Sequence, residues 1–319
     1  MVTILKVLHC PNCGGDVEIQ ENFISAVCPY CSSKIALSPE DLGINKVTSE
    51  LLGEMFAGQA VGTFLKQQIK KLNRDEFWKE NAHKISLECT DGTIEISYIH
   101  KAVSESAIIL TARSNVILLF EDIKSADKYC NTVKSLKFPQ NDVKNLRQFV
   151  PNITGRFTLI NNQAMVVIEK GDNEYPLSAF KNLPDVHAAW VVSRLENLCC
   201  LLQFNNISVP KFGLSDLYVD PEEHQIYFYG GFESAMPVSK DSIRNELLSL
   251  RQTAANVMGC KSVNETENKV PKDFYEFLNG EPKENPFEDF KQWDLSLTLA
   301  YGKRTFRKLD CTENSIYSN

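Results

Sequence analysis

The sequence lacks an apolar run long enough to cross a membrane, and it lacks an excess of positive charge. The best membrane candidate, residues 51–65, contains Glu54 and is shorter than the roughly 20 apolar residues that a bilayer requires. Lys and Arg number 34 against 41 Asp and Glu, a net charge of -7, which is unsuited to coating nucleic-acid phosphates. No signal peptide is expected, because the first residues lead directly into a cysteine pair. We therefore expect a cytoplasmic protein with no membrane contact.

Cysteine is abundant, but its pattern is not that of a disulfide framework. Of ten cysteines, six stand singly or in apolar runs, and four form two Cys-x-x-Cys pairs: Cys10, Cys13, Cys28 and Cys31. Two intervening residues let both thiolates of a pair face one ion. Four thiolates leave no ligand position open, so the pattern predicts a closed, structural Zn²⁺ site. Reduced dithiols without metal and a thioredoxin-type redox pair are the alternatives, and the second lacks its usual surrounding sequence.

Residues 1–42 are thus predicted to form a zinc ribbon, with residues 14–27 as a short hairpin that returns the second pair to the first. The ribbon is acidic through residue 41. Its two lysines, Lys6 and Lys34, are outnumbered by five acidic residues: Asp16, Glu18, Glu21, Glu40 and Asp41. Nucleic-acid binding needs phosphate-neutralising charge, so a structural or protein-contacting role is favoured.

Residues 43–83 are predicted to be a helical connector. Apolar residues recur at spacings of three and four over residues 48–81, which is typical of an amphipathic helix. Glycines at 53, 58 and 62 weaken that helix, each by about 1 kcal/mol relative to alanine. Packing against the chain's own larger domain is the favoured interpretation. A homo-oligomer or partner interface through this helix is the alternative.

Beyond residue 84 the pattern changes to short strands and then to helices. Strands are predicted at 85–89, 93–98, 107–111, 116–120, 157–160 and 164–168, with one helix at 125–136. Helices are predicted at 186–204, 241–258 and 287–301, with one hairpin between the first two. A sheet followed by helices, without repeating βαβ units, indicates the α+β class.

This order, and several local stretches, resemble the protein kinase fold. Residues 217–228 resemble the hairpin between the kinase catalytic loop and its metal-binding motif, and residues 246–253 resemble the long core helix. The helix 188–204 is similar to the kinase helix that supports the catalytic loop. The strand 167–170 is similar to the kinase strand that leads to the interlobe hinge. The resemblance covers about residues 94–310. It implies a bilobal domain, with a β-rich lobe at 84–183 and a helical lobe at 184–319.

Within that family, the nearest likeness is to zinc-ribbon kinase-like proteins of bacteria and bacteriophages. Those proteins often carry Gly-Gly-aromatic at the metal-binding motif, as Gly230-Gly231-Phe232 does here. The family's catalytic base and magnesium-binding asparagine correspond to Lys211 and Asp216, and its second metal carboxylate corresponds to Gly230. A lysine cannot accept the hydroxyl proton, and glycine offers no ligand.

The phosphate-binding groups of the family are missing as well. The third strand, 116–120, has no lysine, Lys124 follows it and is expected to face solvent, and no Gly-x-Gly-x-x-Gly loop precedes the sheet. The helix that should carry the partner glutamate has other residues instead: Lys128, Asn131 and Lys134. Kinase catalysis depends on positioning and electrostatic stabilisation, so their joint loss removes the mechanism, and we expect no catalytic residue.

The remaining candidates have plainer interpretations. The polar residues of the 217–228 hairpin are typical of a turn: Asp220, Glu222, Glu223 and His224. His100 and His187 have no nucleophile or base at a telling spacing, and Cys199-Cys200 falls on an apolar helix face. Residues 165–169 could line an adenine slot, but without phosphate ligands we expect poor ATP affinity.

The sequence therefore predicts a non-catalytic, pseudokinase-like interaction or regulatory protein that docks a protein partner. One alternative is a divergent kinase-fold enzyme or nucleotide-binding protein with a displaced metal site. A second is a zinc-ribbon regulator that binds nucleic acid.

Overall fold

The computed structural model describes residues 4–9, 16–20, 25–28, 31, 34–36, 59–90, 92–140, 146–302, 309 and 311–317. Its contacts divide the chain into two compact units, Met1–Glu80 and Asn81–Asn319, and each is described by itself. In the part of the chain that the structure describes, no helix combines the length and apolar character needed to cross a membrane.

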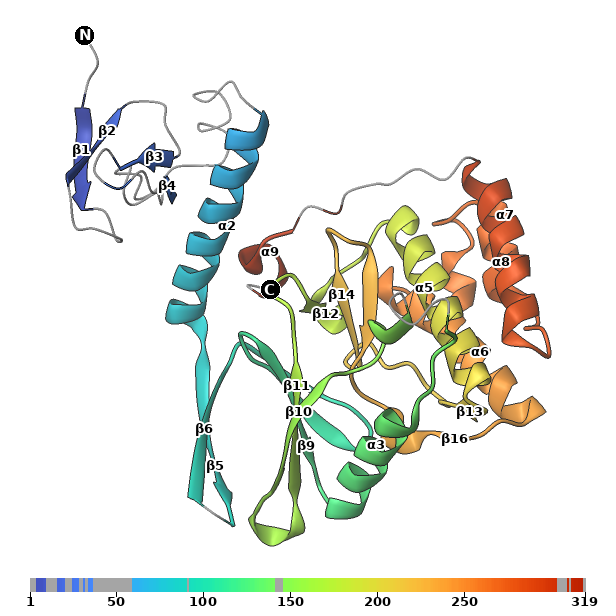
Figure 1. Ribbon diagram of the computed structural model, residues 1–319. Coiled ribbons are helices and arrows are strands. Elements are labelled where there is room, and N and C mark those ends of the chain that lie inside the picture. Colours follow the sequence, from blue (N-terminus) through green and yellow to red (C-terminus); the bar gives the residue numbers. More distant parts are fainter. Residues whose placement is uncertain are drawn as a thin grey trace. The chain divides into compact units, whose positions relative to one another are not determined.

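The first unit contains two small antiparallel hairpins and a long helix (Figure 1). Strand β1 (Ile4–His9) pairs with β2 (Asp16–Gln20), and β3 (Ser25–Val27) pairs with β4 (Lys34–Ala36). Each hairpin therefore spans one Cys-x-x-Cys segment of the sequence. This pairing differs from the expected hairpin over residues 14–27, because the chain reverses at each cysteine pair and its small following residues.

The helix of the first unit, α2 (Gln59–Asn81), is 23 residues long. It ends where the sequence pattern predicts, and residues 48–58 of the predicted connector lie outside the described residues. Ile69, Arg74 and Phe77 are buried on it. Lys79 in its last turn complements the negative end of the helix dipole.

The second unit begins with a five-stranded antiparallel sheet in the order β10-β11-β9-β8-β7. Its strands are β7 (His100–Val103), β8 (Ala107–Thr111), β9 (Asn115–Phe120), β10 (Ile153–Thr158) and β11 (Ala164–Glu169). Helix α3 (Ile123–Ser135) connects β9 to β10. The four-residue strand β7 was not predicted, and β10 begins four residues before the predicted strand at 157–160.

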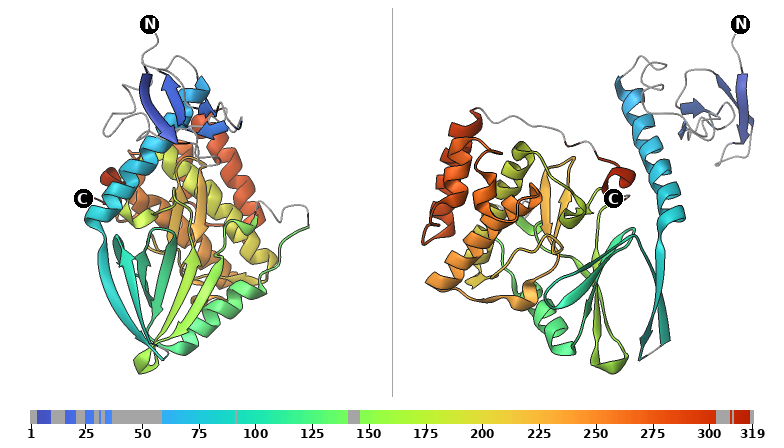
Figure 2. Two further views of the ribbon diagram at one scale, coloured as in Figure 1. Left: turned by 60° about the vertical axis from the view of Figure 1, so that its left-hand side comes forward. Right: turned by 180° about the vertical axis from the view of Figure 1, so that it is seen from behind.

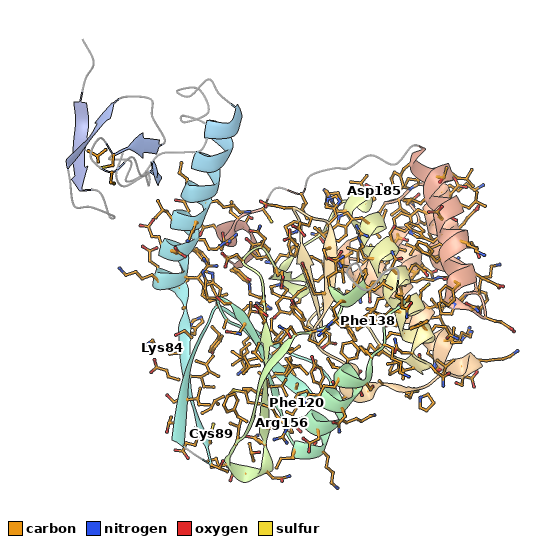
Figure 3. All side chains as sticks on the ribbon, viewed as in Figure 1. Lys84, Cys89, Phe120, Phe138, Arg156 and Asp185 are labelled. Carbon is orange, nitrogen blue, oxygen red and sulfur yellow. The ribbon has the colours of Figure 1, made fainter. Side chains whose placement is uncertain are left out.

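Alternation along the strands gives this sheet two buried faces. Val116, Leu118 and Phe120 belong to the main core with α3, whereas Leu110 and Ile117 belong to a second core on the other face. That second core is completed by apolar residues of a separate hairpin, β5 (His83–Cys89) and β6 (Gly92–Tyr98). Figure 3 labels Phe120 beside α3 and Cys89 at the end of the hairpin. The predicted strands 85–89 and 93–98 thus cover the sheet and do not extend it.

The chain then forms a largely helical part, residues 174–302, which we call the helical lobe; residues 83–169 are the sheet lobe. The helices of the helical lobe are α5 (Asp185–Phe204), α6 (Lys240–Val257), α7 (Lys272–Asn279) and α8 (Pro286–Tyr301). A three-stranded sheet combines β12 (Tyr175–Pro176), β14 (Leu217–Asp220) and β15 (Gln225–Phe228), and β13 (Ile207–Ser208) pairs with β16 (Met236–Pro237). The α+β order is confirmed, and Figure 2 shows it from two further sides.

Side-chain caps explain where several helices begin. Asp122 accepts a hydrogen bond from the Ser125 amide at the start of α3, and Ser239 with Ser242 forms a capping box at the start of α6. At α8, Asn285 is the cap and Pro286 is the first helical residue, where its missing N–H costs no hydrogen bond. Helix α7 was not predicted, because its eight residues are too few for a clear period.

Candidate functional site

A group of tyrosine side chains lies at the junction between the two lobes. The hydroxyl groups of Thr111 on β8 and Tyr218 on β14 lie 2.7 Å apart, and both residues are fully buried. The rings of Tyr218 and Tyr229 follow with centroids 5.1 Å apart, and Tyr227 stacks on Tyr229 at 5.6 Å. The Tyr229 hydroxyl donates to Glu174 Oε2 at 2.5 Å. Side chains of the chain itself therefore occupy the place where the lobes meet.

Burial decides the protonation of this tyrosine group. Desolvation raises the pKa of Tyr218 and of Tyr229, and nearby Glu174 adds to the rise for both phenols. Desolvation also raises the pKa of Glu174, against the hydrogen bond from Tyr229. The phenols are thus neutral donors at any physiological pH.

The connection between the lobes, residues 169–174, has its backbone donors in use. The Glu169 amide donates to the Asn152 carbonyl and the Lys170 amide to the Ser114 carbonyl, both at 2.9 Å. Met165, in the predicted adenine slot, belongs to the core beneath the β5–β6 hairpin and not to the lobe junction. The Glu169 amide of the slot expected from residues 165–169, and the Lys170 amide next to it, are therefore not free to bind an adenine ring.

The residues predicted to stand at the catalytic positions are brought close together. Lys211 pairs with Glu105 of the β7–β8 turn at 2.7 Å, and both side chains are mostly exposed. Asp216 is 8% exposed, and its backbone carbonyl accepts hydrogen bonds from the amides of Tyr229 and Gly230. Burial, followed by the charge of Glu233, raises the pKa of Asp216 to about 7.

Glycine is required next to this aspartate. A Cβ on Gly230 would lie 2.1 Å from Asp216 Oδ1, and one on Gly213 would lie 2.5 Å from Oδ2. Asp216 Oδ1 and Glu233 Oε2 are buried without a hydrogen-bond partner among the described residues. Among all the residues that the structure describes, no three His, Cys, Asp or Glu side chains lie close enough together to hold a metal ion.

Helix α3 places a tyrosine on its buried face. Tyr129 is fully buried, and its hydroxyl donates to the Tyr229 carbonyl. The residues predicted for this helix, Lys128, Asn131 and Lys134, lie on it and are exposed. Its buried residues are Ala126, Tyr129, Cys130 and Val133. Lys124 is exposed, as expected. Sequence reasoning missed Tyr129, whose spacing from the other buried residues of α3 was the available signal.

A second contact joins the β7–β8 turn to the helical lobe. The Ser106 hydroxyl donates to Glu233 Oε1 in the short helix Phe232–Ser234. Phe232 is buried and meets Tyr129 edge-on, with ring centroids 6.0 Å apart. The β7–β8 turn is therefore tied to the segment that follows Gly230-Gly231.

Buried charges in the helical lobe form a separate cluster. Arg251 of α6 donates to both carboxylate oxygens of Asp289 on α8 at 3.0 Å, with side-chain exposures of 1% and 0%. Glu196 is buried beside them, and desolvation with the charge of Asp289 raises its pKa well above the ordinary value. Glu246 accepts from the Val209 amide at 2.6 Å, and burial raises its pKa to about 7. This cluster holds helices together and lies in the core.

The other candidates from the sequence have structural roles. Asp220 Oδ1 accepts from the amides of Glu222 and Glu223 at 2.8 and 3.0 Å, which is the expected turn chemistry. Trp190 stacks on His224 at 4.9 Å, and its indole N–H donates to His187 Nδ1 at 3.3 Å. Cys199 is fully buried, and burial raises the pKa of its thiol and raises that of Cys200 to about 12. Neither thiol is a reactive nucleophile there.

Two of the four predicted zinc ligands are described. Cys28 is buried and Cys31 is partly buried, at the two ends of the turn between β3 and β4. Cys10 and Cys13 lie outside the described residues, between β1 and β2. The zinc site thus stays a prediction, and the two hairpins agree with a cysteine pair at each turn.

Comparison with known proteins gives a weak structural likeness. No family model matches the sequence, and no curated protein matches it. Vaccinia related kinase 3 is 13% identical with a TM-score of 0.45, over 67% of this chain and 91% of that one. The bifunctional kinase-methyltransferase WbdD is 12% identical with a TM-score of 0.42, over 64% of this chain and 48% of that one. Values this low carry no residue roles across to this chain.

Proposed function

We propose that this chain is a zinc-binding, kinase-like protein that acts by contacting a protein partner and does not transfer phosphate. The observation that carries the proposal is the Thr111–Tyr218 hydrogen bond, made where both side chains are fully buried between the lobes. A nucleotide entering there would have to break this bond and move the tyrosines around it. Breaking a buried pair without replacing it leaves unsatisfied polar groups, at about 1–3 kcal/mol each.

The kinase-like part of the proposal is supported by element order. Five antiparallel strands carry one helix between the third and fourth, and a mainly helical lobe follows with the β14–β15 hairpin after its first long helix. This is the order that the sequence resemblance implies. A likeness of fold alone does not define activity.

The non-catalytic part is supported by the charges at the lobe junction. The base position holds Lys211, which pairs with Glu105, and the metal-carboxylate position holds Gly230, where no side chain fits beside Asp216. The connecting segment uses two of its amides internally. Phosphoryl transfer needs these groups free and correctly charged.

Calorimetric titration with ATP plus Mg²⁺ or Mn²⁺ tests this proposal. We expect no saturable heat for ATP with either metal, and none for adenosine, which probes the adenine slot without the phosphates. The variant K211M is a matched control, because it removes the cation at the base position without opening the junction. Tight, metal-dependent ATP binding would instead favour the divergent enzyme with a displaced metal site.

The zinc part of the proposal rests on the number and spacing of the four cysteines. It is supported by their sequence positions, one pair between β1 and β2 and one pair between β3 and β4. A bound Zn²⁺ would crosslink the two hairpins and contribute directly to the folding of this small module. Metal analysis of the purified chain should give one zinc per molecule. The variants C28S and C31S should lose it, whereas C89S, a cysteine of the β5 strand, should keep it. A folded first unit without metal would contradict the assignment.

A further inference from the structure

A short C-terminal helix, α9 (Glu313–Tyr317), lies against residues of both lobes. The Tyr175 hydroxyl donates to Glu313 Oε1 at 2.9 Å in a buried environment. The Tyr317 ring lies 6.2 Å from that of Tyr175 and 6.1 Å from that of His100, measured between centroids. Tyr175 belongs to the helical lobe and His100 to β7 of the sheet lobe, so α9 touches both sides of the connection (Figure 1).

We call His100, Tyr175 and Ser178 the α9 seat. His100 Nε2 and Ser178 Oγ lie 3.2 Å apart, and this contact joins the two lobes within the seat. Desolvation lowers the pKa of His100, so the neutral ring packs against Tyr317. With α9 in place, Tyr175 is only 2% exposed. The seat thus combines residues of both lobes, and its His100–Ser178 contact does not involve α9.

The helix cannot owe its order to itself. Five residues are far fewer than the roughly 12–15 that an isolated helix needs in water. Thr312 and Ser315 cap its first turn, with the Thr312 amide donating to Ser315 Oγ at 2.9 Å. The rest of its stability must come from burial of Glu313 and Ile316, which are 6% and 4% exposed.

The three contact residues of α9 share one helix face. Glu313, Ile316 and Tyr317 stand at positions i, i+3 and i+4, the spacing of anchors when a helix binds in a groove. Each anchor has its own chemistry: a carboxylate for the Tyr175 hydroxyl, a buried aliphatic side chain, and a ring beside those of His100 and Tyr175. A site with three distinct requirements selects its ligand.

We propose that α9 is a resident and displaceable ligand of a helix-binding site at the lobe junction. The site would take short helices that present a carboxylate, an aliphatic side chain and a tyrosine at i, i+3 and i+4. This deepens the proposed function, on which it rests, by naming the kind of partner segment that could dock. A partner helix of that pattern would compete with α9 and free the C-terminus.

A peptide-binding experiment on the full chain tests the site. The variant I316D should unseat α9 by placing a charge in its apolar contact. A fluorescent peptide of residues 309–319, with C311S to prevent disulfides, should then bind the variant saturably, as measured by anisotropy. The wild-type chain should bind it at least tenfold more weakly, because its seat is occupied.

Two controls separate seat binding from general stickiness. A peptide carrying E313Q should lose most of its affinity for the I316D protein. In the double-variant protein Y175F/I316D, the affinity for the wild-type peptide should fall, whereas the affinity for the E313Q peptide should fall no further. Equal binding by the wild-type and I316D chains, or none by a folded I316D chain, would overturn the proposal. If I316D fails to fold, Y317A, at a partly exposed residue, serves in its place.

These outcomes are independent of the ATP titration. If neither the peptide nor ATP binds, the proposed helix-binding site is contradicted and the proposed non-catalytic function is not. Metal-dependent ATP binding with intact peptide binding would do the reverse.

Discussion

Arg251 and Asp289 form an ion pair in which one guanidinium nitrogen donates to both carboxylate oxygens, and both side chains are buried away from solvent. The guanidinium carbon also lies 4.6 Å from the centre of the Phe277 ring, and the Lys283 amide donates to Asp289 Oδ1 at 2.8 Å. Both carboxylate oxygens of Asp289 and both terminal nitrogens of Arg251 are therefore bonded, whereas Arg251 Nε is buried without a hydrogen-bond partner among the described residues. Such a pair adds little relative to apolar residues, but losing one partner leaves a buried charge alone.

The variant D289N should destabilise the fold by about 3–5 kcal/mol, because it leaves Arg251 buried without its counter-ion. The double variant R251M/D289L should recover much of that loss. Urea unfolding measures both. The exposed pair Arg244–Glu281, joined at 2.7 Å, is the matched control, and E281Q should change little. A D289N effect as small as that of E281Q would contradict the role given to the pair.

The hydroxyl pair at the lobe junction makes a second prediction. T111V should cost about 1–3 kcal/mol, because it leaves the buried Tyr218 hydroxyl without a partner, and Y218F should cost a similar amount by stranding Thr111. The double variant T111V/Y218F should cost clearly less than the sum, which a double-mutant cycle measures by urea unfolding. Strict additivity would mean that the two hydroxyl groups do not interact.

Stability should depend on pH through Asp216. Its folded-state pKa of about 7 lies above its ordinary value of 3.8, so the folded chain holds a proton that the unfolded chain has released. The stability from this group is full below about pH 4 and is lost as pH rises through 7. The stability of D216N relative to that of the wild-type chain should therefore be higher at pH 8 than at pH 5.5.

Thermal melting at these two pH values measures that difference. The exposed residue Glu267 supplies the control, since E267Q should shift the melting temperature equally at both pH values. An equal shift for D216N would mean that Asp216 ionises in the fold much as it does in the unfolded chain.

Gly230 should resist substitution. In G230A the new Cβ overlaps Asp216 Oδ1, and Asp216 cannot swing away because Gly213 lies against its other oxygen. We expect a loss of about 1–3 kcal/mol, typical of overpacking. The double variant D216A/G230A, which removes the oxygen that the new Cβ would meet, is the control and should lose less than the sum of the two single variants. G230D restores a carboxylate at the metal position, yet it should give no metal-dependent ATP binding, because the same overlap displaces it.

Much of the larger unit follows from sequence periodicity. The strands at 107–111 and 164–168 and the helices at 186–204 and 241–258 agree with the structure to within a residue or so. Periodicity could not show which face of the sheet β5 and β6 cover, because it gives the inward side of each strand but not the strand or sheet that this side meets. Pairing across the sheet is a long-range property that a single strand pattern does not contain.

The absent charges of the site were foreseeable, but their replacements were not. Lys211 and Gly230 could be read by position, whereas the Tyr129 contact to the Tyr229 carbonyl and the Ser106 contact to Glu233 join residues about a hundred or more positions apart. The filling of the junction by Tyr218 and Tyr229 was likewise hidden, because a tyrosine in a β-strand is ordinary. Only the folded chain brings these hydroxyl groups to their acceptors.

The β5–β6 hairpin precedes in the sequence the sheet that it covers. During synthesis, its apolar side chains leave the ribosome before β7 to β11 exist to receive them. At about 5–20 residues per second, the 60 or so residues from Tyr98 to β10 take several seconds to appear. The apolar side chains of Ile85, Leu87 and Ile96, which are packed in the second core of the folded chain, are exposed to solvent during that interval. The nascent chain therefore passes through an aggregation-prone stage.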